Sequence, residues 1–600
     1  MANKLIDKTK AFTKQEFIPN LSADELNDIV TNKMREINFG MLDKEYSALS
    51  PANQRALEHL VKAADILDKV FLKQDQPDNI RAKEHLEREA AKGDKWAQQA
   101  LTLFTLHNGV EGVDMYARKS VPIDLFKDKK LQPGKGFYPQ DLTEDELVKY
   151  ILKHPEQASA LLGSNTMVQR QGKNLIAVPY SQAFPKEMAE ASYELIAAAN
   201  ETDHAGLAKY LRLQAAALTN DSDPQTVYEA DKSCANDLEG SPLEFTIGRE
   251  NYEDRLSSQT AVDPRLAKVL KGVVTKSKDS MSARVGIINH DSDPWFKFYK
   301  DNLPEVIKRM PLRDQYDVQD NGPMNTADVD LVAFMGDYAA NRGGITIAQN
   351  LPNSDKLAVQ LKAGRRLVFH RQIRQSVDPV AQKKMLDAVV DKSQQALYDS
   401  ESDFYFTIGH EFGHSLGPGT TRDGRDKSAA LGAYGSMLEE NKADLISIFM
   451  TGILKDQGKY TEEQANKIFL TWAVGELPFK QPAPEEAHRS RSLMQVNYFR
   501  EKGAIILEKG QPMKIVPEKM ASAAEQMLKE VIQLQLDGDP VKAEAFVKKY
   551  AVWNDAMQYA ADQKMSLQPK LYRLMKQPLR DKLLKLHAAP ARAPARKPSM

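Results

Sequence analysis

Two histidines four residues apart constrain this chain more than any other feature, because they predict a helix and the face that it turns inward. The chain reads His410-Glu411-Phe-Gly-His414. Residues four apart share a helix face, so His410 and His414 can present two ring nitrogens to one metal ion. Glu411 lies beside the first histidine and can take a proton from a water bound to that ion. The alternative is a helix whose histidines are ordinary polar or core residues.

A third metal ligand must come from another part of the chain. A motif with three histidines would need one six residues after His414, where the chain has Thr420, so that arrangement is excluded. A helical pattern 26 residues after His414 offers Glu440, with Asp444 on the same face. One carboxylate of this helix can then bind Zn²⁺, while its acidic neighbours accept the free N–H of a ligating imidazole. Without the histidines, the adjacent pair Glu439-Glu440 would indicate only a solvated helix face.

Zinc is the expected metal, at one ion per chain. Two histidines and one glutamate form a ligand set that also accepts cobalt, so metal availability decides between the two ions.

Composition limits the kind of protein that can carry this site. The chain has 600 residues, 42% of them hydrophobic and 28% charged, which is typical of a globular protein with more than one core. A formal net charge of -1 argues against a nucleic-acid partner, because phosphate binding needs concentrated positive charge. The one cysteine, Cys234, cannot form an intramolecular disulfide, which favours a reducing compartment.

The chain shows no obvious targeting or membrane segment. Its first eight residues are not followed by the apolar run of a signal peptide. The most apolar stretch, 446–454, is much shorter than the roughly 20 residues of a membrane span. We therefore expect a cytoplasmic protein without membrane partners, either a monomer or a homodimer.

The periodicity of apolar residues predicts an α+β fold. Helical patterns occupy the first 120 residues and return from about Pro379 almost to the end. Thr143, with an acidic residue three positions later, predicts a helix start. The tail 588–600 is rich in proline, alanine and arginine, and should be disordered. Strands are predicted as a hairpin at 166–170 and 174–179 and as single runs at 244–248, 283–288, 331–334 and 344–348.

The metal motif and the acidic helix together resemble the dipeptidyl peptidase III family. A His-Glu-x-x-His motif followed by Glu439-Glu440-x-Lys-Ala-Asp444 is similar to the bacterial and nudix-linked branch of that family. The animal and yeast enzymes have one more residue between the two histidines. The resemblance implies that Glu440 is the metal ligand and that Glu439 is the partner of a histidine.

A second segment resembles the part of the family that holds the amino end of a peptide. It contains Glu250 and Tyr252. The resemblance implies that Glu250 binds the free ammonium group and that Tyr252 steadies the tetrahedral intermediate, since a phenol can donate to a developing oxyanion. Taken alone, Tyr252 would be an ordinary half-buried strand residue.

Two further segments resemble parts of the family that contact the substrate. In the first, Asn350 and Asn353 would bind the leading residues of a peptide that adds to a strand edge, although Asn-Leu-Pro-Asn is also good turn chemistry. In the second, His488 would donate to the oxyanion or orient the reacting carbonyl. A lone histidine is more often structural, so the role of His488 depends mainly on the resemblance.

The resemblance implies a two-lobed metallopeptidase with a cleft between a mixed lobe and a helical zinc lobe. The expected division is 1–293 for an N-terminal helical region with a β core, 294–567 for the zinc lobe with 344–367 contributing to the other lobe, 568–587 for a C-terminal helical segment, and then the tail.

The implied reaction is hydrolysis of short peptides with release of N-terminal dipeptides. Glu411 would be the general base, and Tyr252 and His488 the oxyanion donors. One alternative is a zinc hydrolase of different specificity, either an endopeptidase or an enzyme for non-peptide amides or esters. Another is a catalytically silent peptide-binding protein, which would have no need of Glu411.

Overall fold

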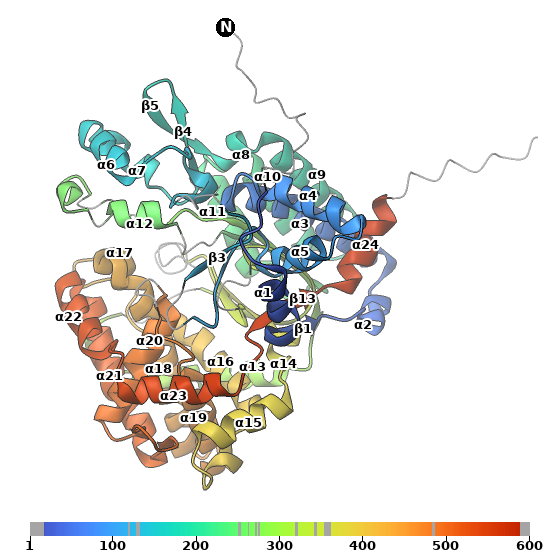
Figure 1. Cartoon of the computed structure of the whole chain (residues 1–600). Helices are drawn as coiled ribbons and strands as arrows, with labels where there is room; N and C mark the ends of the chain where they lie inside the picture. The colour runs from blue at the N-terminus through green and yellow to red at the C-terminus, as the bar shows by residue number, and fades with distance from the viewer. Residues whose placement is uncertain are drawn as a thin grey trace, which may run out of the picture.

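The computed structural model shows a protein of two lobes (Figure 1). One lobe is built mainly from the first half of the chain and the other from helices of the second half. The α+β fold predicted from the sequence is confirmed. The structure describes residues 17–588 except for 118–120, 128–132, 250–253, 262, 271–272, 274–276, 318–321, 341–344, 353–361 and 483–485.

A five-stranded mixed sheet forms the β core, in the order β6-β7-β8-β10-β9. Neighbouring strands are antiparallel except for β8 and β10, which are parallel. The short strand β9 lies at one edge of this sheet. The strands are β6 (Leu243–Arg249), β7 (Met281–Asn289), β8 (Met324–Gly336), β9 (Ala348–Leu351) and β10 (Arg365–His370).

The sequence predicted four of these strands and missed β10. The arginines that begin β10 are polar, yet all six residues of this strand are buried. Burial is possible because the Arg366 guanidinium pairs with the Glu244 carboxylate of β6 at 2.6 Å, and a buried charge is tolerated when it has such a partner. The predicted strand at 344–348 also lies earlier than β9, which begins at Ala348.

Long helices cover the sheet in the first lobe. Helix α3 (Pro51–Asp75) buries Leu57, Leu60 and Leu67 in a core shared with Val285 of β7. Its neighbours include α9 (Pro185–Glu201) and α10 (Ala205–Thr219). The other elements of this part are α1 (Ala23–Asp28), α2 (Asp43–Ala48), α4 (Asn79–Ala91), α5 (Lys95–His107), β2 (Glu111–Val113), β3 (Pro122–Asp124), α6 (Glu144–Lys153), α7 (Ala158–Leu161), α8 (Tyr180–Ala183), α11 (Pro224–Asn236) and α12 (Arg255–Ala261).

Two local predictions in this lobe are confirmed. The hairpin forms from β4 (Thr166–Gln171) and β5 (Asn174–Pro179), with Gly172 at φ 63° in its turn. Such a positive φ favours glycine, which has no Cβ to clash. Thr143 caps α6, since its side chain accepts a hydrogen bond from the backbone N–H of Glu146.

The end of the chain returns to the first lobe. Strand β1 (Met34–Asn38) pairs in parallel with β13 (Tyr572–Lys576), and α24 (Pro578–Ala588) then packs against α3. The segment 568–587, predicted to be helical, therefore contains a strand. Its partner lies more than 500 residues away in sequence, so local periodicity could not indicate the pairing. The predicted tail lies almost entirely outside the described residues.

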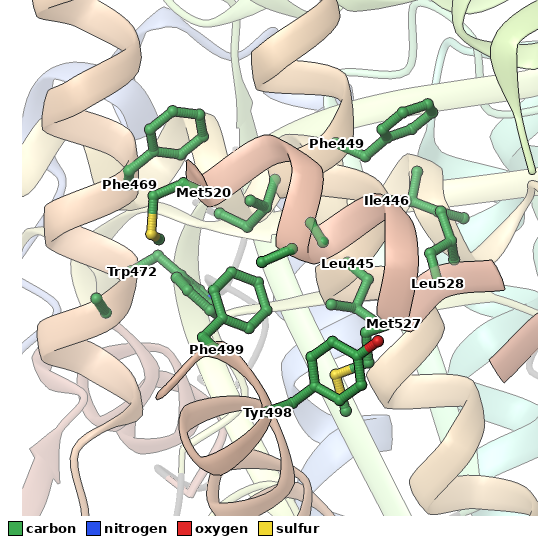
Figure 2. Packing of buried hydrophobic residues seen from close by; sticks show 14 of the residues in the cluster. Leu445, Ile446, Phe449, Phe469, Trp472, Tyr498, Phe499, Met520, Met527 and Leu528 are labelled. Carbon is green, nitrogen blue, oxygen red and sulfur yellow. The ribbon is translucent and has the colours of Figure 1, made fainter. Parts of the chain in front are cut away.

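The second lobe is a bundle of helices around α18 (Gly435–Asp456), which is buried along most of its length. Figure 2 shows its Leu445, Ile446 and Phe449 among aromatic and methionine side chains of neighbouring helices. Those neighbours include α16 (Ser400–His414), α19 (Glu462–Glu476), α20 (Ala487–Glu501) and α21 (Pro517–Asp537). Its other elements are α13 (Asp293–Arg309), α15 (Pro379–Val389), α17 (Lys427–Leu431), β11 (Ile505–Ile506), β12 (Lys514–Ile515), α22 (Pro540–Tyr550) and α23 (Asp555–Ser566). The short helix α14 (Arg371–Gln375) contacts β8 and β1 of the first lobe.

The expected lobe boundaries stay a prediction, but the sheet shows which residues the β core contains. Strand β8 pairs with β7 on one side and β10 on the other. The β core therefore includes 324–336 as well as residues from the expected insertion at 344–367. Among the helices of the described residues, none combines the length and apolar character needed to cross a bilayer.

Helices α16 and α18 approach each other closely because glycines line their contact. A Cβ added to Gly413 would lie 2.7 Å from the Ala443 carbonyl oxygen and 3.0 Å from the Ala443 Cα. One turn earlier, a Cβ on Gly409 would collide with the side chain of Ser447. Any larger residue at either position must push the two helices apart.

Replacing Gly413 with alanine should therefore destabilise the protein, by about 1–3 kcal/mol for an overpacked core position. Gly475→Ala in α19 is the matched control, because a Cβ there would meet no atom within 4 Å. That change should stabilise the fold by about 0.5–1 kcal/mol, since a helical alanine loses less entropy than glycine. Thermal unfolding of both variants checks the prediction, and a Gly413→Ala variant as stable as Gly475→Ala would contradict it.

Candidate metal centre

The crossing of α16 and α18 brings His410, His414 and Glu440 together. The two histidine Nε2 atoms lie 3.1 Å apart. The Glu440 Oε2 atom lies 3.5 Å from Nε2 of His410 and 3.7 Å from Nε2 of His414. Within the described residues, this is the one group of three or more histidine, cysteine or acidic side chains whose ligand atoms converge in this way.

Each histidine is oriented through its other ring nitrogen. Nδ1 of His410 lies 2.6 Å from Oδ1 of Asp444, and Nδ1 of His414 lies 3.1 Å from Oε1 of Glu439. Carboxylates only accept hydrogen bonds, so each Nδ1 donates its proton. The two Nε2 atoms then direct their lone pairs toward the same point, as metal-ligating imidazoles do.

The charges around this point call for a cation. In the described part of the chain, neither Glu411 nor Glu440 is paired with a lysine or arginine, and one carboxylate oxygen of each is buried without a hydrogen bond. Buried carboxylates without positive partners are costly. Two nitrogen lone pairs beside two such carboxylates suit a divalent ion, and a donor set of two imidazoles and a carboxylate is one that zinc prefers.

The pKa values of the protein alone point the same way. Burial would lower the pKa of His410, but its contacts with the carboxylates of Asp444 and Glu440 raise that pKa to about 10. Burial raises the pKa of Glu411 against the opposing effect of the two histidines, which favours a carboxylate able to accept a proton.

Two buried lysines that were not predicted as site residues hold Glu439 in place. Nζ of Lys442 lies 2.8 Å from one Glu439 oxygen, and Nζ of Lys427 lies 3.2 Å from the other. The same lysines donate to the Leu416 and Pro418 carbonyls just after α16, at 2.6 and 3.0 Å. The two lysines therefore connect the end of α16 with Glu439, the residue that orients His414. Complete burial of these two lysines marks them as part of the metal centre, and only the structure reveals that burial.

His488 lies at the open side of the centre. It belongs to the first turn of α20, and its Nδ1 lies 3.5 Å from Oε2 of Glu440. Its side chain is 64% exposed, so a molecule approaching Glu440 from solvent would meet this imidazole.

Asn350 ties the edge strand β9 to the histidine helix. Its side-chain N–H groups donate to the backbone oxygen of Glu411 at 2.6 Å and to Oγ of Ser415 at 3.0 Å. Its Oδ1 is buried and has no hydrogen-bond partner among the described residues. The free group of this amide is thus an acceptor. The other predicted substrate residues, Glu250, Tyr252 and Asn353, lie outside the described residues.

Sequence comparison relates this chain to a plant protein. No family model matches the chain. Nudix hydrolase 3 of Arabidopsis thaliana is 25% identical over 558 residues, which span 85% of this chain and 68% of that protein.

Two solved structures share the architecture. The dipeptidyl peptidase III of Caldithrix abyssi superposes with a TM-score of 0.74 at 26% identity, covering 92% of this chain and 99% of that one. The dipeptidyl peptidase III of Corallococcus sp. strain EGB gives a TM-score of 0.77 at 21% identity, covering 95% and 100%. The shared fold and the 26% identity to the Caldithrix abyssi protein support the resemblance to the dipeptidyl peptidase III family that the sequence indicated.

Proposed function

We propose that this protein is a zinc-dependent peptidase that releases dipeptides from the free amino end of short peptides. The observation that carries the proposal is the convergence of His410, His414 and Glu440, with the buried carboxyl of Glu411 beside them. A Zn²⁺ ion, when bound, lowers the pKa of water and polarises a carbonyl group. The fold shared with two dipeptidyl peptidase III structures and the 26% identity to one of them support a peptide as the substrate.

Glu411 is the base in this proposal. Its buried carboxylate takes a proton from the water that attacks the peptide carbonyl, and then gives that proton to the leaving amine. The raised pKa of Glu411 suits both steps, because the group must accept and release a proton near neutral pH.

The residues around the centre would orient the peptide. The free acceptor of Asn350 can take an N–H of the substrate, and β9 offers a sheet edge to an extended chain. His488 can donate to the carbonyl oxygen as negative charge develops on it. From the sequence resemblance, we propose that Glu250 binds the free amino group of the peptide and that Asn353 contacts its backbone. Tyr252 would be a second donor to the oxyanion.

Replacing Glu411 with glutamine should abolish turnover without removing the metal. A glutamine keeps the shape of the side chain but cannot accept the proton, so kcat should fall by about 10²–10⁴-fold. The test is metal analysis of purified wild type and Glu411→Gln, with mass spectrometry of their digests of a free-amine hexapeptide. We expect equal zinc in both proteins and dipeptides from wild type only.

An N-acetylated copy of the same hexapeptide separates the proposed activity from its alternatives. A dipeptidyl peptidase should leave the blocked peptide intact. Equal cleavage of both peptides would identify an endopeptidase instead. A zinc-loaded wild type that cleaves neither peptide would favour another substrate class or a binding role.

Zinc should stabilise the fold only when Glu440 is present. An ion that binds the folded state alone, at a hundredfold excess over its Kd, adds about 2.7 kcal/mol. We expect the Tm of the chelator-treated wild type to rise when zinc is added, and that of Glu411→Gln to rise equally. Glu440→Gln should show almost no rise, because it loses a proposed ligand. An unchanged zinc response in Glu440→Gln would exclude this residue as a ligand.

A further inference from the structure

A chain of buried ion pairs begins at the metal centre and extends away from it through three more helices. His410 of α16 bonds to Oδ1 of Asp444 in α18. The other oxygen of Asp444 forms an ion pair with the guanidinium of Arg491 in α20. The same guanidinium lies 3.2 Å from both carboxylate oxygens of Glu476 in α19. Arg491 therefore bridges two carboxylates, one of which orients a proposed metal ligand.

The charged side chains that form these ion pairs are largely buried. The side chains of Asp444, Glu476 and Arg491 are 0%, 8% and 11% exposed. Buried charges are retained only when their partners are well placed, and removing one partner leaves the others uncompensated. The planar guanidinium suits such a bridge, because its N–H groups point in fixed directions toward two acceptors. The geometry of this group is therefore tightly determined.

Arg491 also lies on the helix that presents His488. The two residues are three positions apart in α20, and His488 stands at the exposed end of that helix. By holding this turn of α20 to Asp444 and Glu476, Arg491 fixes where His488 meets Glu440. One side chain thus connects an exposed imidazole with the buried side of the metal centre.

We propose that Arg491 is a positioning residue of the active site, acting through Asp444 on His410 and through the first turn of α20 on His488. Glu476 takes part by holding Nη2 of the guanidinium, while Asp444 holds Nη1. This proposal rests on the metal site of the proposed function. It adds a residue that touches neither the metal ligands nor the substrate.

The test compares four variants with wild type. Arg491→Met removes both ion pairs while keeping an unbranched side chain, and Glu476→Gln keeps its shape but loses its charge. The double variant completes a cycle. Arg500→Met is the control, since Arg500 lies on the same helix but pairs at 3.7 Å with the exposed Glu508. For each protein, the zinc Kd is measured by chelator competition, with kcat and KM on a free-amine peptide and the Tm.

We expect Arg491→Met to raise the zinc Kd by about 10–100-fold, as loss of an outer partner of a metal ligand does. Its kcat, measured at saturating zinc, should fall because His488 is displaced. Glu476→Gln should raise the zinc Kd less, and in the Arg491→Met background it should not raise the zinc Kd any further. Arg500→Met should match wild type in zinc Kd and kcat.

Two outcomes would overturn the proposal. A lower Tm in Arg491→Met, with zinc Kd and kcat unchanged, would reduce Arg491 to a structural tie between helices. A further rise in the zinc Kd when Glu476→Gln is added to Arg491→Met would show that Glu476 acts on the metal centre independently of Arg491. Failure of the wild type to bind zinc would instead contradict the proposed function, so the two failures are distinguishable.

Discussion

The close contact between α16 and α18 is the constraint on which the metal centre depends. Gly409 and Gly413 let the two backbones approach, so that Glu439, Glu440 and Asp444 reach the histidines across the contact. Without that approach, two nitrogen lone pairs and a carboxylate oxygen could not converge on one point. The sheet is joined to the same contact, because Asn350 of β9 donates to the backbone of α16 beside Glu411. Helix packing, rather than loop structure, therefore sets the geometry of the site.

The sequence alone could predict those parts of the site in which two functional residues are four positions apart on one helix. His410 and His414 are four residues apart on one helix, and Glu440 and Asp444 are four apart on another, so local geometry places each pair on one face. The family resemblance then linked the two helices. Alternating and helical apolar patterns likewise predicted the hairpin β4–β5 and most of the sheet, because those patterns depend on near neighbours in sequence.

What the sequence could not predict depends on partners distant in the chain. Strand β10 begins with arginines, and only the position of Glu244 in β6 makes their burial possible. Strand β13 needs β1, which lies at the other end of the described chain. In the sequence, Lys427 and Lys442 cannot be told from surface lysines, and only the structure shows that both pair with Glu439. The role of Arg491 could not be predicted either, since its two carboxylate partners come from two other helices.

X-ray absorption spectroscopy of the zinc-loaded protein tests the central claim most directly, because it reports the atoms around the ion whether or not a substrate is known. The account predicts two imidazole nitrogens at about 2.0–2.1 Å and oxygen ligands at about 2.0–2.2 Å. Glu440→Gln should lose this spectrum, and Glu411→Gln should keep it. A shell with no imidazole contribution, or one that is the same in Glu440→Gln as in wild type, would contradict a centre built from His410, His414 and Glu440.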